Sequence, residues 1–200
     1  QERYSDDSLL PAVILAMTPF TRFIIVFSLL RQALGLQQSP PNQILIGLSL
    51  FLAALVMQPT LQQVKTEALD PYVAGEMATG EAVTTAMEPM RLFMLSNVRR
   101  DDLATMMKIA RLPRPKSLED VPSTAIVSAF LLSELKTAFI IGVKVFLPFL
   151  MLDIVVASIL LGMGMMVLPP PVISLPFKLL LFVLMDGWGL LVTSMVASIR

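Results

Sequence analysis

Apolar residues are gathered in four segments, which alternate with short breaks and with one long polar stretch. The segments run over residues 9–34, 44–57, 124–168 and 172–199. Prolines stand at most of the breaks, at Pro40-Pro41, Pro59 and Pro169–Pro171. Proline has no backbone N–H and disfavours the helical conformation of the residue before it. The pattern therefore predicts two helical hairpins with a polar region between them.

The polar region spans residues 60–123 and carries eight basic and nine acidic residues, more than half of the charge in the chain. Apolar residues in TTAMEPMRLFML, residues 84–95, recur at helical spacing, which predicts a helix. Asn97 and the following RRDD run indicate a break. Asp101 is expected to cap a second helix over DLATMMKIA.

Two of the apolar segments have lengths that do not suit a simple membrane span. A spanning helix needs about 20 residues to cross roughly 30 Å of hydrocarbon. The second segment would cover only about 21 Å at 1.5 Å per residue. The third is too long for one span, and a break near Pro148 is expected.

The composition indicates a membrane protein. Apolar residues make up 56% of the chain and charged residues 15%, with a mean hydropathy of +0.77, whereas soluble domains are about 25% charged. The net charge is zero, which argues against a nucleic-acid partner. The chain has no cysteine and no histidine, so thiol nucleophiles and Ser-His-Asp triads are excluded. There is no GxxxxGK[ST] motif for a nucleotide, and no cofactor or metal is expected.

Seven charged residues interrupt the apolar segments: Arg22, Glu134, Lys136, Lys144, Asp153, Lys178 and Asp186. A charge at the centre of a bilayer costs about 3 kcal/mol on insertion scales. Some of these side chains could lie near helix ends and extend to the interface. The alternative is that the helices are buried in a protein assembly, where the charges find partners.

Hairpin geometry bears on which charges could meet. If the last two apolar segments fold back on each other at the prolines, Asp153 and Asp186 lie at one level. Lys178 then lies roughly 14 Å from Asp153 along the axis. A staggered neighbouring subunit would bring them together, so Asp153 and Lys178 are candidates for an ion pair between subunits.

The stretch GMGMMVLPPP, residues 162–171, sets three methionines beside two glycines and three prolines. Methionine is unbranched and fits irregular or changing surfaces, while glycine and proline weaken a helix. Met163, Met165 and Met166 are either ordinary filler at a hairpin turn or a deformable apolar seal around a pore.

Three stretches carry a resemblance to a known family. They are MTPFTRFIIVFSLLRQALG (17–35), LVMQPT (55–60) and the long run from Leu135 to Leu191 that contains LKTAFIIGVKVFLPFLMLD and PFKLLLFVLMDGWGLL. The sequence closely resembles the FliP family, the P subunits of the flagellar type III export gate. The resemblance covers nearly the whole chain, with a looser match in the polar region.

The resemblance implies an all-α fold of membrane-associated helical hairpins with a polar helical insert, assembling into a helical ring. Family members lose a signal peptide, which fits the QERYSDD start. Five copies join Q and R subunits at the flagellar basal body in the bacterial inner membrane. The pore is closed at rest and gated, and unfolded flagellar proteins pass through it. Other subunits supply the driving force for this export. The chain itself would be no enzyme.

The resemblance also gives an expected organisation. Residues 1–59 form an N-terminal helical hairpin. Residues 60–123 form a polar helical region on the periplasmic side. Residues 124–200 form the pore helices, with Met163, Met165 and Met166 in the gate loop. Four membrane spans are expected from hydropathy, although the assembled complex lies largely above the bilayer.

Three other functions are open from the residues alone. Asp153 and Asp186, in adjacent apolar segments, could be the proton-sharing dyad of an intramembrane aspartyl protease, although the order MDGWG does not match that family's GxGD. A secondary transporter would use intramembrane charges as an ion path, but no inverted repeat is visible. A membrane scaffold would tolerate changes in the methionine stretch.

Overall fold

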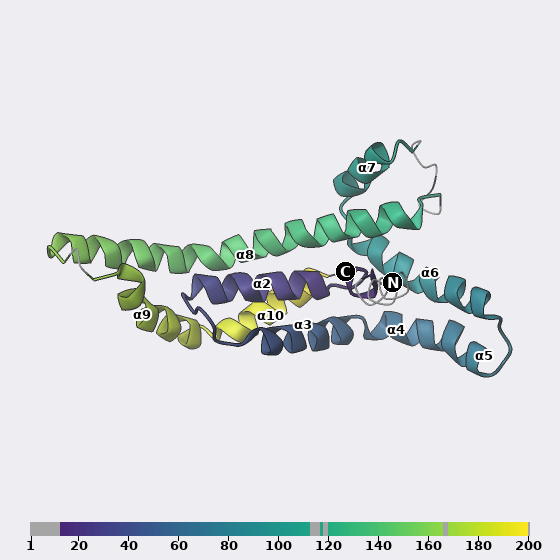
Figure 1. Ribbon diagram of the computed structural model, residues 1–200, viewed down its shortest axis with the longest axis horizontal. Coiled ribbons are helices and arrows are strands. Elements are labelled where there is room, and N and C mark those ends of the chain that lie inside the picture. The colour runs from purple at the N-terminus through teal and green to yellow at the C-terminus, as the bar shows by residue number, and fades with distance from the viewer. Residues whose placement is uncertain (1–12, 113–116, 118–119, 166–167, 200) are drawn as a thin grey trace, which may run out of the picture. The chain divides into compact units, whose positions relative to one another are not determined.

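The computed structural model describes residues 13–112, 117, 120–165 and 168–199 (Figure 1). This part of the chain is helical and contains no strand, so the all-α prediction is confirmed. The helices, in chain order, are α2 (Phe20–Ala33), α3 (Asn42–Val56), α4 (Gln58–Val64), the π-helical turn η1 (Lys65–Leu69), α5 (Asp70–Val73), α6 (Thr79–Asn97), α7 (Arg100–Ile109), α8 (Ser123–Gly162), α9 (Pro170–Leu184) and α10 (Gly187–Ala197).

The chain forms two compact units, and each combines stretches that are far apart in the sequence. The first unit comprises Gln1–Thr21, Leu50–Lys136 and Arg200. The second comprises Arg22–Ser49 and Thr137–Ile199. The boundaries fall inside α3 and α8, so each of these helices contributes residues to both units.

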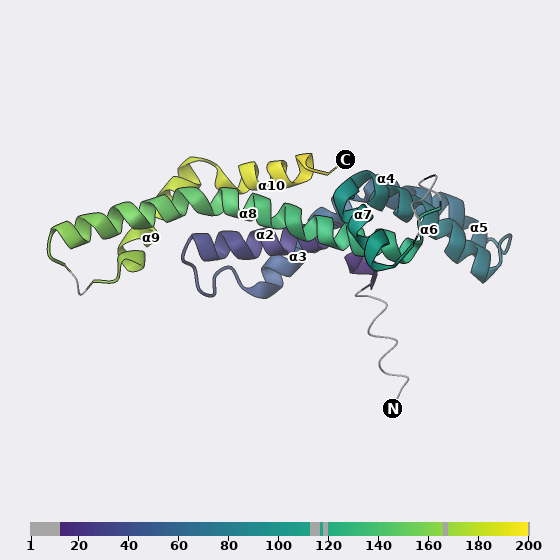
Figure 2. The ribbon, with the colours of Figure 1, turned by 90° about the horizontal axis from the view of Figure 1, so that it is seen from above.

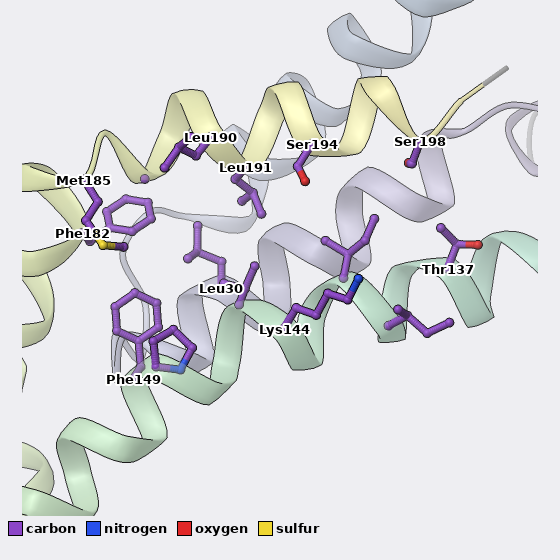
Figure 3. Close-up of a pocket in the computed structure, with 15 residues that line it drawn as sticks. Leu30, Thr137, Lys144, Phe149, Phe182, Met185, Leu190, Leu191, Ser194 and Ser198 are labelled. Carbon is purple, nitrogen blue, oxygen red and sulfur yellow. The ribbon is translucent and has the colours of Figure 1, made fainter.

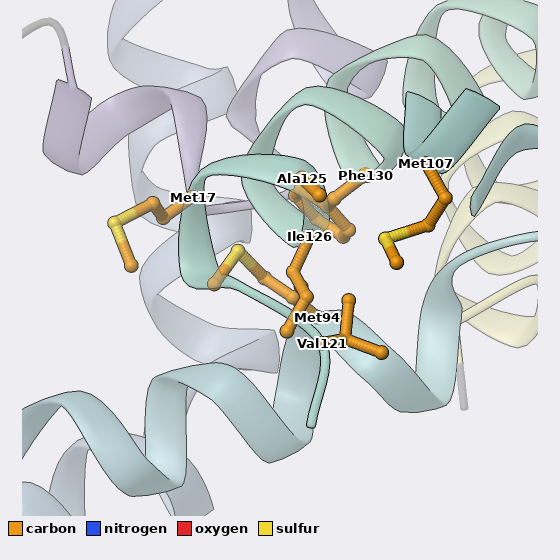
Figure 4. Packing of buried hydrophobic residues seen from close by; sticks show 7 residues of the cluster. All are labelled: Met17, Met94, Met107, Val121, Ala125, Ile126 and Phe130. Atoms are coloured by element: carbon orange, nitrogen blue, oxygen red, sulfur yellow. The ribbon is translucent and has the colours of Figure 1, made fainter. Parts of the chain in front are cut away.

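The first unit contains a hairpin in which α6 runs back along α4, η1 and α5 (Figures 1 and 2). A separate apolar cluster joins α6, α7 and the start of α8 (Figure 4). Its fully or nearly fully buried members are Met17, Met94, Met107, Val121, Ala125, Ile126 and Phe130. Three of these seven residues are methionines, whose flexible side chains fill the irregular space between short helices.

The second unit packs α2 against α8 and folds α9 and α10 alongside. Gly142 permits the approach of α2, because a Cβ atom there would lie 2.2 Å from the Cδ1 atom of Leu29. Aromatic rings fill the space beyond: Trp188 stacks edge-on against Phe182 with ring centroids 5.4 Å apart, and Phe27 lies 6.1 Å from Trp188.

Four helix ends share one backbone motif. In each, a residue with positive φ follows the helix, and the next N–H reaches back five residues, which is the Schellman pattern. The positive-φ residues are Gly35, Gly75, Arg111 and Gly164. Glycine has no Cβ and adopts this conformation without steric cost; Arg111, with a φ of 54°, does not share this advantage.

Two local expectations are wrong. The helix α8 does not break at Pro148 but continues for 40 residues from Ser123 to Gly162. An interior proline removes one hydrogen bond, and α8 continues without it. Asp101 is not the N-cap of α7. Arg99 holds that position, and Asp101 lies in the first turn, where a negative charge is still favourable.

Among the described helices, α8 alone is long and apolar enough to cross a membrane. Two bent pairs, α3 with α4–α5 and α9 with α10, would raise the number to three if each counts as one span. The bends are 65° and 63°. This is fewer than the four spans expected from hydropathy, because α2 is only 14 residues long.

Candidate functional site

The methionine stretch forms an exposed turn at the end of α8. The N–H of Met165 donates to the carbonyl of Leu160, and that of Gly164 donates to Leu161. Gly164, with a φ of 74°, reverses the chain direction. The side chains of Met163 and Met165 are 59% and 43% exposed. Met166 lies outside the described residues. The described part of the turn therefore presents two exposed apolar side chains to its surroundings.

A buried ion pair lies between the two helices that carry this turn. The ammonium of Lys178, on α9, lies 2.6 Å from a carboxylate oxygen of Asp153, on α8. Ser174, one turn before Lys178, donates its hydroxyl to the other carboxylate oxygen. Lys178 also donates to the backbone carbonyl of Ala33 at the end of α2. The side chain of Lys178 is 4% exposed, whereas that of Asp153 is 28% exposed.

The expected pairing of Asp153 and Lys178 between subunits is not what this chain contains, since the two residues pair within it. The prediction assumed that the helix continued to the prolines. Instead α8 ends at Gly162, nine residues after Asp153, and α9 begins at Pro170, eight residues before Lys178. At 1.5 Å per residue these offsets are about 13 Å and 12 Å, so the two side chains lie at one level.

The prediction that Asp153 and Asp186 lie at the same level along the hairpin is also wrong. Asp186 does not lie opposite Asp153, because α9 ends at Leu184 and Asp186 occupies the corner before α10. Both carboxylate oxygens of Asp153 are engaged by Ser174 and Lys178. The two acids therefore do not form a proton-sharing dyad here, which removes the geometric basis for an aspartyl protease.

Two more of the predicted charges are buried. Arg22, on α2, is 2% exposed and donates a hydrogen bond of 2.7 Å to the hydroxyl of Ser198 beyond α10. Glu134, on α8, is fully buried. Arg22 and Lys178 are thus buried and have partners within this chain itself, while the burial of these helices in an assembly stays a prediction.

Lys136 belongs to a second polar network, in the first unit. It pairs with Asp102, a buried residue in the first turn of α7. The Ser133 hydroxyl donates to the second carboxylate oxygen of Asp102 and accepts the N–H of Arg99. Burial raises the pKa of the Asp102 carboxyl. The hydrogen bonds from Lys136 and Ser133 and the charges of Lys136 and Arg99 outweigh it, so the pKa lies below its usual value.

Lys144 and Asp186 have no such partners among the residues that the structure describes. Lys144 projects from α8 into a cavity of about 510 Å³ in the second unit (Figure 3). Phe149, Phe182 and Leu191 line the cavity, with hydroxyl groups of Thr137 and Ser194 nearer its polar end. Asp186 is exposed, with its carboxylate folded over Gly189 in the first turn of α10.

The sequence matches a known family over almost its whole length. The FliP family model covers residues 7–195. The chain belongs to the FliP family. It is 51% identical over 191 residues to the flagellar biosynthetic protein FliP of Bacillus subtilis, covering 96% of this chain and 86% of that one. It is 52% identical to FliP of Pectobacterium carotovorum over 94% of this chain and 73% of that one, and 48% identical to FliP of Caulobacter vibrioides over 96% and 73%.

Membership of the FliP family confirms the resemblance on which the sequence analysis relied. The apolar composition agrees with α8, which is long and apolar enough to span a membrane. The family match runs through the methionine turn and the Asp153–Lys178 pair alike.

Sequence reasoning missed several partners in these networks, among them Ser174, Asp102 and the carbonyl of Ala33. Ser174 had a detectable signal, because it lies four residues before Lys178 and so on the same helix face. Asp102 was hidden in the charged RRDD run, where nothing marks one of the two acids as buried. A backbone carbonyl at a helix end gives no signal at all.

Proposed function

We propose that this chain is a subunit of the flagellar type III protein export gate, in which it forms part of a closed, gated pore for unfolded flagellar proteins. Its membership of the FliP family supports the flagellar role. The observation that carries the pore is the exposed methionine turn, held at the end of a hairpin by a buried ion pair.

The turn suits a seal for physical reasons. Methionine side chains rearrange at little cost and close against one another or around a passing chain. Met163 and Met165 are exposed in this chain, so they are available to meet the same residues of other copies. The Asp153–Lys178 pair fixes the two supporting helices while the turn itself moves. Met166 belongs to the same proposed gate.

The partners and the location follow from the same proposal. Five copies of this chain join Q and R subunits in a ring at the basal body, in the bacterial inner membrane. Residues 60–123 form the periplasmic part, residues 1–59 the N-terminal hairpin and residues 124–200 the pore helices with the gate. The chain catalyses no reaction; it provides a conduit, and other subunits supply the driving force.

The surface of α8 fits such an assembly. Large apolar side chains recur along it at helical spacing and are all exposed: Phe139, Val143, Leu147, Met151, Val155 and Ile159. A stripe of this size needs either lipid or another protein surface to cover it. In the proposed ring, neighbouring subunits cover part of the stripe.

The test replaces Met163, Met165 and Met166 with alanine in cells and records ion leakage and flagellar export. The complex must first be shown to assemble. The matched control is Met77→Ala, a partly exposed methionine in the loop after α5, which lies outside both the turn and the stripe on α8. Leakage with export retained in the triple variant alone supports the seal. Normal export without leakage from an assembled complex would mean that the turn is not the gate, as would be expected of a scaffold.

A further inference from the structure

The cavity beside Lys144 has an apolar end and a polar end (Figure 3). It has a volume of about 510 Å³, and the residues that line it belong to the second unit. Phe149 and Phe182 lie at the apolar end, and the hydroxyl groups of Thr137 and Ser198 lie at the other. A cavity divided in this way fits an amphiphile, with its hydrocarbon chain against the rings and its headgroup beside the hydroxyl groups.

The polar end of this cavity is positively charged. Lys144 is the only charged residue among the described residues that line the cavity, and its side chain extends toward the hydroxyl groups. Lys144 is exposed, so a headgroup can reach it from outside the chain. A second cation is bound to the same end, because the buried guanidinium of Arg22 donates a hydrogen bond of 2.7 Å to the Ser198 hydroxyl. Basic pockets between membrane helices bind anionic headgroups, so the charges favour a ligand with a negative headgroup.

Lys144 also lies where lipid headgroups are found when a single chain is inserted in a bilayer. The helix α8 has 40 residues and is about 60 Å long, twice the roughly 30 Å of hydrocarbon that a span must cross. Its longest stretch with a single charged residue is 145–162, which is about 27 Å long. The charge in that stretch, Asp153, is neutralised by Lys178. This stretch is therefore the part of α8 that best suits the hydrocarbon, and Lys144 stands at its border, next to the headgroups.

We propose that the Lys144 cavity binds one phospholipid with a net negative headgroup, whose phosphate contacts the Lys144 ammonium and whose acyl chain lies along the Phe149 and Phe182 rings. The site belongs to the single chain in a bilayer and rests neither on the ring assembly nor on the gate proposed above. A zwitterionic lipid would place its own ammonium group near Lys144 and is disfavoured for that reason. The alternative occupant, an apolar segment of another protein chain, would exclude lipid from the cavity, and the test separates the two.

The single tryptophan of the chain reports on this cavity. The ring centroid of Trp188 lies 5.4 Å from that of Phe182, which lines the cavity, and the neighbouring Gly187 lines it too. Bromine atoms on an acyl chain quench tryptophan emission on contact. The full chain is reconstituted in phosphatidylcholine vesicles that contain a small fraction of brominated phosphatidylglycerol or, in the comparison, of brominated phosphatidylcholine. We expect half-maximal quenching at an about fivefold lower fraction of the anionic lipid, the factor that one lysine contributes near a membrane surface.

Three variants assign the preference to Lys144. Lys144→Met removes the charge and should abolish the preference, whereas Lys144→Arg keeps the charge and should keep the preference. The matched control is Lys108→Met, which removes an exposed lysine of α7 in the first unit and should leave the preference unchanged. Trp188 is itself 41% exposed, so contact with the surrounding lipid adds a baseline. This baseline is the same for both lipids, and the ratio of the two fractions removes it.

Each other outcome overturns the proposal. Equal quenching by the two brominated lipids would show that the cavity does not select an anionic headgroup, and this comparison needs no variant. A preference that persists in Lys144→Met, or that is lost equally in Lys108→Met, would show that the general charge of the surface attracts the lipid. Quenching by neither lipid would show that protein covers the cavity.

Discussion

The ammonium nitrogen of Lys178 lies 3.0 Å from the backbone carbonyl oxygen of Ala33, a residue 145 positions earlier in the chain. Ala33 is the last residue of α2, and carbonyls at a helix end have no partner within the helix. They also carry the negative end of the helix dipole. Lys178 therefore neutralises two negative groups at once, the α2 terminus and the Asp153 carboxylate, and joins the N-terminal helix to the α8–α9 hairpin.

The first prediction concerns this lysine. Replacing Lys178 with methionine keeps the length of the side chain but leaves Asp153 and the Ala33 carbonyl unpaired. The loss of one partner from a buried pair costs about 3–5 kcal/mol. Because Asp153 is 28% exposed and water can reach it, we expect roughly 1–3 kcal/mol here. Thermal unfolding of the purified chain in detergent measures the loss.

The companion variants make this result specific. Adding Asp153→Asn to Lys178→Met removes the stranded charge, so the double variant should recover part of the lost stability. Lys144→Met, which removes an exposed lysine that has no partner within the described part of the chain, should change the unfolding temperature little. Equal effects of the two lysine variants would contradict the assignment of Lys178 as a structural bridge.

From the sequence, partners for the charges in the apolar segments were one of two open interpretations, and the sequence did not show which residues the partners are. The Asp153–Lys178 pair was placed between subunits because the end of α8 was put at the prolines. The helix actually ends at Gly162, where Gly164 forms the reversing turn. A shift of seven residues along a helix is about 10 Å. An error of this size in the helix end is enough to make a pair within one chain look like a pair between two chains.

Other features gave no signal in the sequence. The second unit joins residues 22–49 to residues 137–199, and no local pattern shows which distant helices pack together. At Pro148 the local rule predicted a break, but α8 is continuous from Ser123 to Gly162, although the proline removes one hydrogen bond. The helix type, the break after Asn97 and the family were readable because they depend on neighbouring residues.

A second prediction distinguishes two glycines of the methionine turn. Gly164 has a φ of 74°, so Gly164→Ala forces a side chain into the left-handed region and should cost about 1 kcal/mol. Gly162 is the last residue of α8 and has open space around its Cα. Gly162→Ala should therefore raise stability, by up to about 1 kcal/mol. Unfolding temperatures of the two variants, two positions apart, should move in opposite directions; a shift in the same direction would refute the turn geometry.

A third prediction concerns pH. The pKa of Asp102 is lowered in the folded chain, so its charged form is stabilised by folding. This contribution is fully present above the unfolded pKa of about 3.9 and is lost as the pH falls through the lower folded value. The stability difference between the unmodified chain and Asp102→Asn should therefore be largest at neutral pH. It should shrink progressively as the pH is lowered below about 4.

The neighbouring acid provides the control for that titration. Asp101 lies one position earlier in the same helical turn but is exposed. Asp101→Asn should lose only the favourable interaction with the helix N-terminus, about 0.3–1 kcal/mol, and should therefore change the stability and its pH dependence less than Asp102→Asn does. Unfolding by denaturant at a series of pH values measures both variants. A constant difference between the unmodified chain and Asp102→Asn across the series would show that the carboxylate contributes by shape and not by charge.

The last prediction uses the only tryptophan of the chain as a reporter. A Cβ atom at Gly187 would lie 2.2 Å from the ring of Phe182, which is 5% exposed and stacks against Trp188. Gly187→Ala must therefore displace a packed ring, at a cost of about 1–3 kcal/mol, and should shift the fluorescence of Trp188.

At Gly189 the nearest atom is a carboxylate oxygen of the exposed Asp186, which can rotate away. Gly189→Ala should therefore destabilise by less and leave the emission closer to that of the unmodified chain. The opposite order of the two variants would show that the Phe182 ring, and not Asp186, is free to move at this corner.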